Sequence, residues 1–193
     1  NTELALNLLA EVSTTELSRM QKPSGYDETK ATLIVLNNNG ITISNNNGGV
    51  VVNANEVTIT LPGEYDIMGE ISEGSIIVSL EEDADAIINL RGVKLTSTTT
   101  HPIYIESGNE VDISIKSETV NYIYDKRTIT STDAVGGAIY SQVDLDIKGK
   151  GTLYVTSTYN NGIASTKDLT IKNLTLEVNV PNNALFFKPC PYI

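Results

Sequence analysis

Apolar and polar residues alternate along most of this chain from Ala31 onward, which is the pattern of β-strands and not of helices. One alternating segment, with isoleucine at its centre, recurs at residues 57–61, 86–90, 111–115, 145–149 and 169–173. A second alternating segment follows each copy, and a third closes the cycle at 74–79, 101–106, 137–142, 162–167 and 184–189. The chain therefore repeats a unit of three short strands at intervals of roughly 24 to 34 residues.

A repeat of this length is typical of folds that stack one supersecondary unit on the next. We therefore predict an all-β domain, a right-handed parallel β-helix with three sheets and about 5–6 coils, in which each coil adds one strand to each sheet. The alternative is a sandwich of β-hairpins. The sequence disfavours the sandwich, because Asn-Gly pairs do not recur at hairpin spacing and fall instead at the expected corners.

Stacked coils place equivalent residues above one another, so the pattern predicts ladders of inward-pointing side chains. The ladder expected from the first segment consists of Ile59, Ile88, Ile113, Ile147 and Ile171. The ladder expected from the third segment consists of Ile76, Ile103, Ile139, Ile163 and Leu185.

The beginning of the chain differs from the repeats. Ala5, Leu8, Leu9 and Val12 fall on one face of a helix. We predict that residues 1–25 form a short N-terminal helix and linker that cap the first coil, and that residues 26–193 form the β-helix domain. The alternative is that this helix docks onto a separate partner. Because the sequence does not begin with Met, we expect it to be a processed or excised portion of a longer protein.

The composition excludes several classes of partner and site. The chain carries 13 Lys and Arg against 24 Asp and Glu, a net charge of −11, which repels nucleic acid. No apolar run approaches the roughly 18 residues needed to span a bilayer, so membrane insertion is not expected. The chain has one cysteine, Cys190, and one histidine, His101. These numbers exclude an internal disulfide and metal sites built from several such residues.

Because side chains alternate along a strand, the residues next to the third-segment ladder point outward. They form a column of Ile77, Tyr104, Tyr140, Ala164 and Phe186. Exposed aromatic rings stack on sugar rings, which makes Tyr104, Tyr140 and Phe186 candidate carbohydrate-binding residues. The alternative is that the capping helix, a loop or a second protomer covers the column.

The first segment places charged residues outward as well. Asp112 and Asp146 are expected side by side on adjacent strands, as are Lys148 and Lys172. Paired aspartates favour a bound cation, and calcium, a hard ion that prefers oxygen ligands, suits them best. The paired lysines favour an anionic ligand and join the candidate carbohydrate-binding residues. The alternative is that these charges compensate one another on a solvated face.

Three stretches, residues 57–79, 86–115 and 138–171, resemble the secreted bacterial carbohydrate-binding β-helix family, whose members are described as carbohydrate-binding domain-containing proteins. The likeness runs from about Tyr26 to about Val180. It implies a pectate-lyase-like fold, an extracellular or cell-surface location, binding of plant polysaccharides, and calcium in the turns of the coils. The family's Asn-Asp-Gly-Ile phrase reads Asn-Asn-Gly-Ile at residues 160–163 here. The Asp-to-Asn difference removes a negative charge, which weakens calcium binding.

These observations leave three hypotheses for the function. The first is a non-catalytic extracellular module that recognises plant cell-wall polysaccharides. The second is a calcium-assisted lyase on acidic polysaccharides, in which Asp112 and Asp146 hold the ion and Lys148, Lys172 or Arg91 meets the sugar carboxylate. The third is a structural or adhesive module that packs against neighbouring modules of a larger surface protein.

Overall fold

The computed structural model of the protein describes residues 31–128 and 136–187. These residues fold into strands joined by turns and contain no helix, hence none long and apolar enough to cross a bilayer. The strands are β1 (Thr32–Leu36), β2 (Thr42–Ser44), β3 (Val50–Asn53), β4 (Glu56–Ile59), β5 (Gly63–Ile71), β6 (Ser75–Ser79), β7 (Ala86–Ser97), β8 (Ile103–Ser107), β9 (Glu110–Ile115), β10 (Val120–Asp125), β11 (Gly137–Ser141), β12 (Asp144–Gly149), β13 (Thr152–Ser157), β14 (Asn161–Ser165), β15 (Leu169–Lys172), β16 (Thr175–Asn179) and β17 (Leu185–Phe187).

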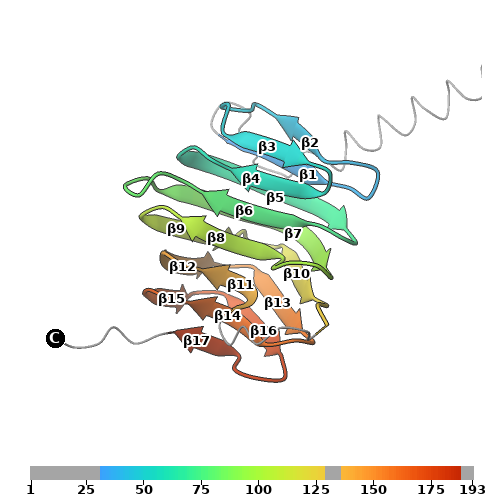
Figure 1. Ribbon diagram of the computed structural model, residues 1–193, viewed down its shortest axis with the longest axis vertical. Helices are drawn as coiled ribbons and strands as arrows, with labels where there is room; N and C mark the ends of the chain where they lie inside the picture. The colour runs from blue at the N-terminus through green and yellow to red at the C-terminus, as the bar shows by residue number, and fades with distance from the viewer. Residues whose placement is uncertain (1–30, 129–135, 188–193) are drawn as a thin grey trace, which may run out of the picture.

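The strands form two sheets. One has ten strands, with the order β15-β12-β9-β7-β10-β13-β16 and with β1, β2 and β5 off this path. The other has seven strands in the order β17-β14-β11-β8-β6-β4-β3. Figure 1 shows the layers one above another, from β1–β4 at one end to β15–β17 at the other. Most neighbouring strands are parallel, whereas the pairs β1–β2 and β3–β4 near the N-terminal end are antiparallel.

The expected right-handed parallel β-helix with three sheets is wrong, because the described residues form two mixed sheets, neither of which is closed. Strand β7 explains the difference. Its first half pairs with β9, from Ala86 opposite Val111, and its second half pairs with β10, from Lys94 opposite Tyr122. At Gly92, where φ is +86°, the register with β5 shifts by one residue, from Leu90 opposite Ile67 to Val93 opposite Gly69, and the pairing then continues. Two groups of strands that were expected to form separate sheets are therefore one sheet.

The side chain of Asn121 on β10 holds this register shift in place. Its Oδ1 accepts hydrogen bonds from the backbone N–H groups of Gly92 and Val93, both at 2.9 Å. Asn121 is fully buried, and its amide also donates to the hydroxyl of Thr119 at 3.1 Å. The register shift therefore leaves these backbone donors of β7 satisfied, as buried polar groups must be.

The core lies between the two sheets and consists mainly of isoleucine, leucine and valine. The ladder predicted from the third segment is confirmed: its five residues follow one another in register from β6 to β17. The ladder predicted from the first segment is confirmed for Ile88, Ile113, Ile147 and Ile171. The assignment of its first member was wrong, because Ile59 lies on β4 in the seven-stranded sheet, opposite Val78. The irregular layers at the N-terminal end account for this error.

The two ends of the stack differ in their packing. The last layer, β15 to β17, has no further layer beyond it among the described residues, so its apolar side chains are only partly buried. Leu185 is 43% exposed, whereas its ladder neighbour Ile163 is 0% exposed. The predicted N-terminal helix and linker at residues 1–25 lie outside the described residues.

Candidate functional site

Tyr104 on β8 and Tyr140 on β11 form an aromatic pair on the outer surface of the seven-stranded sheet. The two residues are directly opposite each other in the parallel ladder. Their ring centroids are 5.5 Å apart and their planes differ by 7°, so the rings are stacked. The predicted column is in register along its whole length, but Ala164 is buried and separates Phe186 on β17 from the tyrosine pair. The structure therefore brings together two of the three predicted aromatic residues.

His101 contacts both rings of this pair, with centroid distances of 5.5 Å to Tyr104 and 5.1 Å to Tyr140. Its Nδ1 donates to the carbonyl oxygen of Gly137 at 2.7 Å, and its Nε2 accepts from Arg127 at 3.4 Å. On the other side, the Gln142 side-chain amide donates a hydrogen bond to the Tyr104 hydroxyl. Burial raises the pKa of both tyrosine hydroxyls, so they are neutral hydrogen-bonding groups at physiological pH.

A groove of about 450 Å³ adjoins the tyrosine pair through Gln142, which lines it and contacts the Tyr104 hydroxyl, whereas neither tyrosine belongs to the lining. Gln142 and Glu106, the residue two positions after Tyr104 on β8, belong to its lining. The other charged side chains in the lining are those of Glu82, Asp144 and Lys167. The groove is thus lined by carboxylates, amides and one ammonium group. These are hydrogen-bond acceptors and donors suited to a ligand rich in hydroxyl groups.

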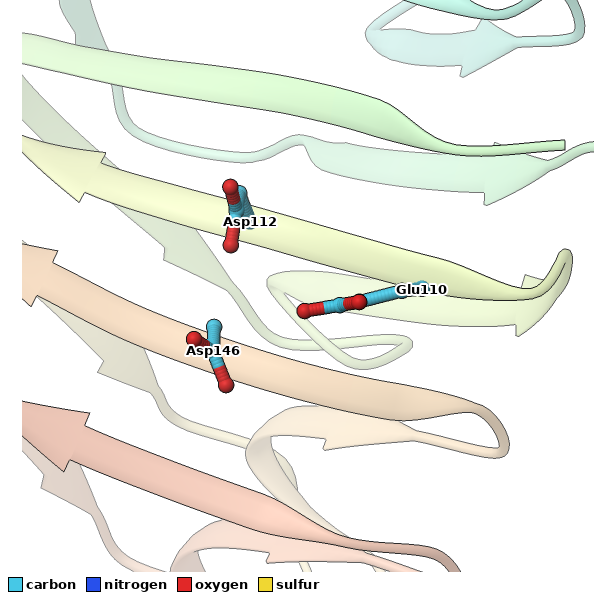
Figure 2. Close-up of side chains that lie close together, drawn as sticks. All are labelled: Glu110, Asp112 and Asp146. Carbon is cyan, nitrogen blue, oxygen red and sulfur yellow. The ribbon is translucent and has the colours of Figure 1, made fainter.

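A charged cluster lies on the outer surface of β9 and β12, next to the groove residue Asp144. Asp112 and Asp146 are opposite each other in the ladder, as predicted, and so are Lys148 and Lys172. Glu110 joins the two aspartates, and Figure 2 shows the three carboxylates coming from two adjacent strands. One carboxylate oxygen from each residue lies within 4.8 Å of the others.

Sequence reasoning missed Glu110 and the groove. The signal for Glu110 was present, because it lies two positions before Asp112 and therefore points to the same side of the strand. The groove had no such signal, since its lining comes from turns and strand ends whose spatial relationship depends on the insertions between repeats.

The lysines of the cluster are paired with the aspartates. The Lys148 Nζ lies 2.7 Å from Asp112 Oδ2 and 4.0 Å from Asp146 Oδ2, and the Lys172 Nζ lies 3.3 Å from the same Asp146 oxygen. The hydrogen bond to Asp112 raises the pKa of the Lys148 ammonium. Burial, followed by the nearby carboxylates of Asp146 and Asp112, raises the pKa of Glu110.

The three carboxylates fit a hard cation such as calcium in ligand type, since all three offer oxygen atoms. The Oδ1 atom of Asp112 is buried and makes no hydrogen bond within the described residues. However, the Lys148 ammonium already provides the positive charge between Asp112 and Asp146. A cation in this place would share the carboxylates of Asp112 and Asp146 with Lys148.

Arg91, which the lyase hypothesis placed near a sugar carboxylate, is engaged elsewhere. Its Nε lies 2.8 Å from Asp66 Oδ2, and the two side chains are 15% and 2% exposed. Asp66 also accepts a hydrogen bond of 2.6 Å from the buried Asn89. A guanidinium held in a buried ion pair is not available to a ligand without leaving a buried carboxylate unpaired.

Comparison with known proteins gives matches over most of the chain. The sequence model of a family described as "Carbohydrate-binding domain-containing protein" matches residues 53–189. A protein of the same description from Acetivibrio thermocellus is 33% identical over 162 residues, which cover 81% of this chain. The chain spans 57% of the length of that relative. A solved structure of a polysaccharide lyase-like protein from C. thermocellum, a gadolinium derivative, is 30% identical with a TM-score of 0.69, covering 81% of this chain and 70% of the other.

Proposed function

The chain belongs to the family of carbohydrate-binding domain-containing proteins, and from this membership we propose that it is a non-catalytic module that binds plant cell-wall polysaccharides outside the cell. The pairing of Tyr104 and Tyr140 beside the groove is the observation that carries this proposal. The apolar face of a pyranose ring packs against aromatic rings, and its hydroxyl groups need hydrogen-bond partners. The tyrosines and the groove residues offer both.

The polar residues of the groove favour hydroxyl groups as the recognised chemistry. Glu82 and Glu106 make no ion pair within the described residues, so their carboxylates are able to accept hydrogen bonds from sugar hydroxyls. Lys167 offers a donor from the same groove. The extracellular or cell-surface location, and neighbouring modules of a larger protein, belong to this proposal and are supported by the resemblance described for the sequence.

A calcium-assisted lyase is the second candidate, because one similar structure is that of a polysaccharide lyase-like protein. Such an enzyme needs a basic group that is deprotonated at the working pH and free to take a proton from the sugar. Lys148 has a raised pKa and donates a hydrogen bond to Asp112, and Arg91 is paired with buried Asp66. These contacts favour binding over catalysis.

Affinity electrophoresis through gels that contain cellulose derivatives, xylan or polygalacturonate tests the proposed function. We expect retardation by at least one polysaccharide, and weaker retardation of the Tyr104→Ala, Tyr140→Ala double variant. A matched control is Lys150→Met, which changes an exposed residue outside the groove. Migration unaffected by all the polysaccharides would overturn the proposal. Release of unsaturated sugars, followed by ultraviolet absorbance, would favour the lyase instead.

A further inference from the structure

Three tyrosines that take no part in the groove form a second aromatic cluster on β10 and β13. Tyr122 on β10 is directly opposite Tyr154 on β13, with ring centroids 5.0 Å apart and planes that differ by 11°. Tyr124, two positions along β10, has its centroid 6.0 Å from that of Tyr122 and a plane that differs by 8°. The three rings therefore lie in nearly parallel planes.

These rings point away from the core. Their neighbours along the strands, Ile123 and Val155, are 0% and 1% exposed, whereas all three tyrosines are only partly buried. Their hydroxyl groups make no hydrogen bond within the described residues, unlike the hydroxyl of Tyr65, which donates to the carbonyl oxygen of Leu61 at 2.6 Å. The three rings are therefore not part of the core, and their hydroxyl groups can form hydrogen bonds with a ligand.

The surroundings of the cluster are polar. Lys94, which is opposite Tyr122, is paired with Glu70 at 2.7 Å, and Glu177 is opposite Tyr154. The ammonium of Lys126 lies 5.8 Å from the centroid of the Tyr124 ring. A protein interface of stable size has an apolar centre with few charges. Here charged groups adjoin the rings, and the further apolar side chain on this face of β10 is that of Val120, which is 45% exposed. This mixture matches a ligand with apolar ring faces and a polar periphery.

From these contacts we infer that Tyr122, Tyr124 and Tyr154 form a second polysaccharide-binding surface, separate from the groove; this inference rests on the proposed function. Tyr122 and Tyr154 extend the cluster across strands, and Tyr122 and Tyr124 extend it along a strand, so it is wide enough for consecutive sugar units. It lies in the ten-stranded sheet, whereas Tyr104 and Tyr140 lie in the seven-stranded sheet. One molecule therefore engages two polysaccharide segments, which increases the avidity for a polymer over that for a short oligosaccharide.

A tryptophan reporter tests the second surface directly, because the natural chain contains no tryptophan. In Tyr122→Trp, the indole would be the only tryptophan, and binding at this surface should shift or quench its fluorescence. Tyr104→Trp serves as the matched reporter for the groove. The titrations use the polysaccharide that retards the wild-type chain. Where the chain binds both a neutral and an acidic polysaccharide, each is titrated separately. We expect both reporters to respond.

Calorimetry with a short oligosaccharide of the same glycan gives a second measurement. The wild-type chain should bind two equivalents, and the Tyr122→Ala, Tyr154→Ala variant should bind one, because loss of two stacking rings weakens this surface about tenfold or more. Two unaltered equivalents in this variant, or a silent Tyr122→Trp reporter beside a responding Tyr104→Trp reporter, would overturn the inference and leave the proposed function standing. Failure of the wild-type chain to bind any glycan would overturn both the inference and the proposed function.

Discussion

The ammonium of Lys148 on β12 lies 2.7 Å from a carboxylate oxygen of Asp112 on β9. It neutralises part of the negative charge where Glu110 and Asp146 also converge. We predict that Lys148→Met strengthens binding of calcium, because the change removes the ammonium that is paired with Asp112 and adds no new ligand, while Asp146 keeps its contact with Lys172. Terbium luminescence with calcium competition measures the affinity. In the control Lys150→Met, affinity should equal that of the wild-type chain; equal affinity in Lys148→Met would contradict the prediction.

Glu110 should make stability depend on pH. Because its pKa is raised in the folded chain, the folded state binds this proton more tightly than the unfolded state. The stabilising effect is full below the ordinary glutamate pKa of about 4.3 and is lost as the pH rises through the raised value. We expect Glu110→Gln to be more stable than the wild-type chain near neutral pH, by less than about 1 kcal/mol because the side chain is exposed.

Denaturant unfolding of the wild-type chain and Glu110→Gln across a series of pH values provides the measurement. The difference between them should shrink as the medium becomes acidic. A difference that stays constant from acidic to neutral pH would show that the carboxylate of Glu110 does not titrate differently in the two states.

The first-segment ladder allows the same truncation to be compared in an inner layer and in the last layer. Ile147 is 0% exposed, whereas Ile171, its neighbour on β15, is only partly buried. We predict that Ile147→Ala lowers the free energy of unfolding by about 2–5 kcal/mol and that Ile171→Ala lowers it by less. Chemical denaturation measures both. Equal losses would mean that Ile171 is covered as completely as Ile147.

Arg127 should be important for stability through Asp125, which is fully buried. The guanidinium binds both carboxylate oxygens, with Nε 2.9 Å from Oδ1 and an Nη atom 2.7 Å from Oδ2. Arg127→Met leaves a buried carboxylate without its partner and should cost about 3–5 kcal/mol. Adding Asp125→Asn removes the charge, so the double variant should recover part of the loss. A double variant less stable than Arg127→Met would contradict this account.

The groove proposal predicts a graded effect of changes at Tyr104. Tyr104→Ala removes the ring and should weaken polysaccharide binding about tenfold, whereas Tyr104→Phe keeps the ring and should have a smaller effect. The phenylalanine variant still loses the hydrogen bond that Gln142 donates. Calorimetry separates the two contributions. A phenylalanine variant as weak as the alanine variant would mean that the hydroxyl contact, not the ring, carries the affinity.

The register of the strands and the face on which each side chain lies were the features most readily predicted from the sequence. The pairs Tyr104–Tyr140, Asp112–Asp146 and Lys148–Lys172 were predicted correctly, because strict alternation fixes which side chains share a face and repetition fixes their order. The same reasoning applied to the second segments would have identified Tyr122 and Tyr154.

The number of sheets could not be predicted from the alternation of residues in the same way. Whether a corner separates two sheets depends on how many backbone hydrogen bonds continue through it, and β7 continues them past Gly92 with help from Asn121. The antiparallel pairs near the N-terminal end also follow no repeat, which is why Ile59 was assigned to the wrong ladder. The pairing of each lysine with an aspartate depends on side-chain rotamers that alternation does not specify.

The uninterrupted course of β7 has a structural consequence. The charged cluster on β9 and β12 and the tyrosine cluster on β10 and β13 lie on the two halves of one sheet, and β7 belongs to both halves. Turns of only a few residues, at 116–119 and 150–151, also connect β9 to β10 and β12 to β13. These turns are hydrogen-bonded to the layer before them, because the Lys116 N–H donates to the Leu90 carbonyl oxygen at 3.1 Å and the Gly151 N–H donates to the Ile115 carbonyl oxygen at 3.2 Å. No long loop therefore separates the two clusters.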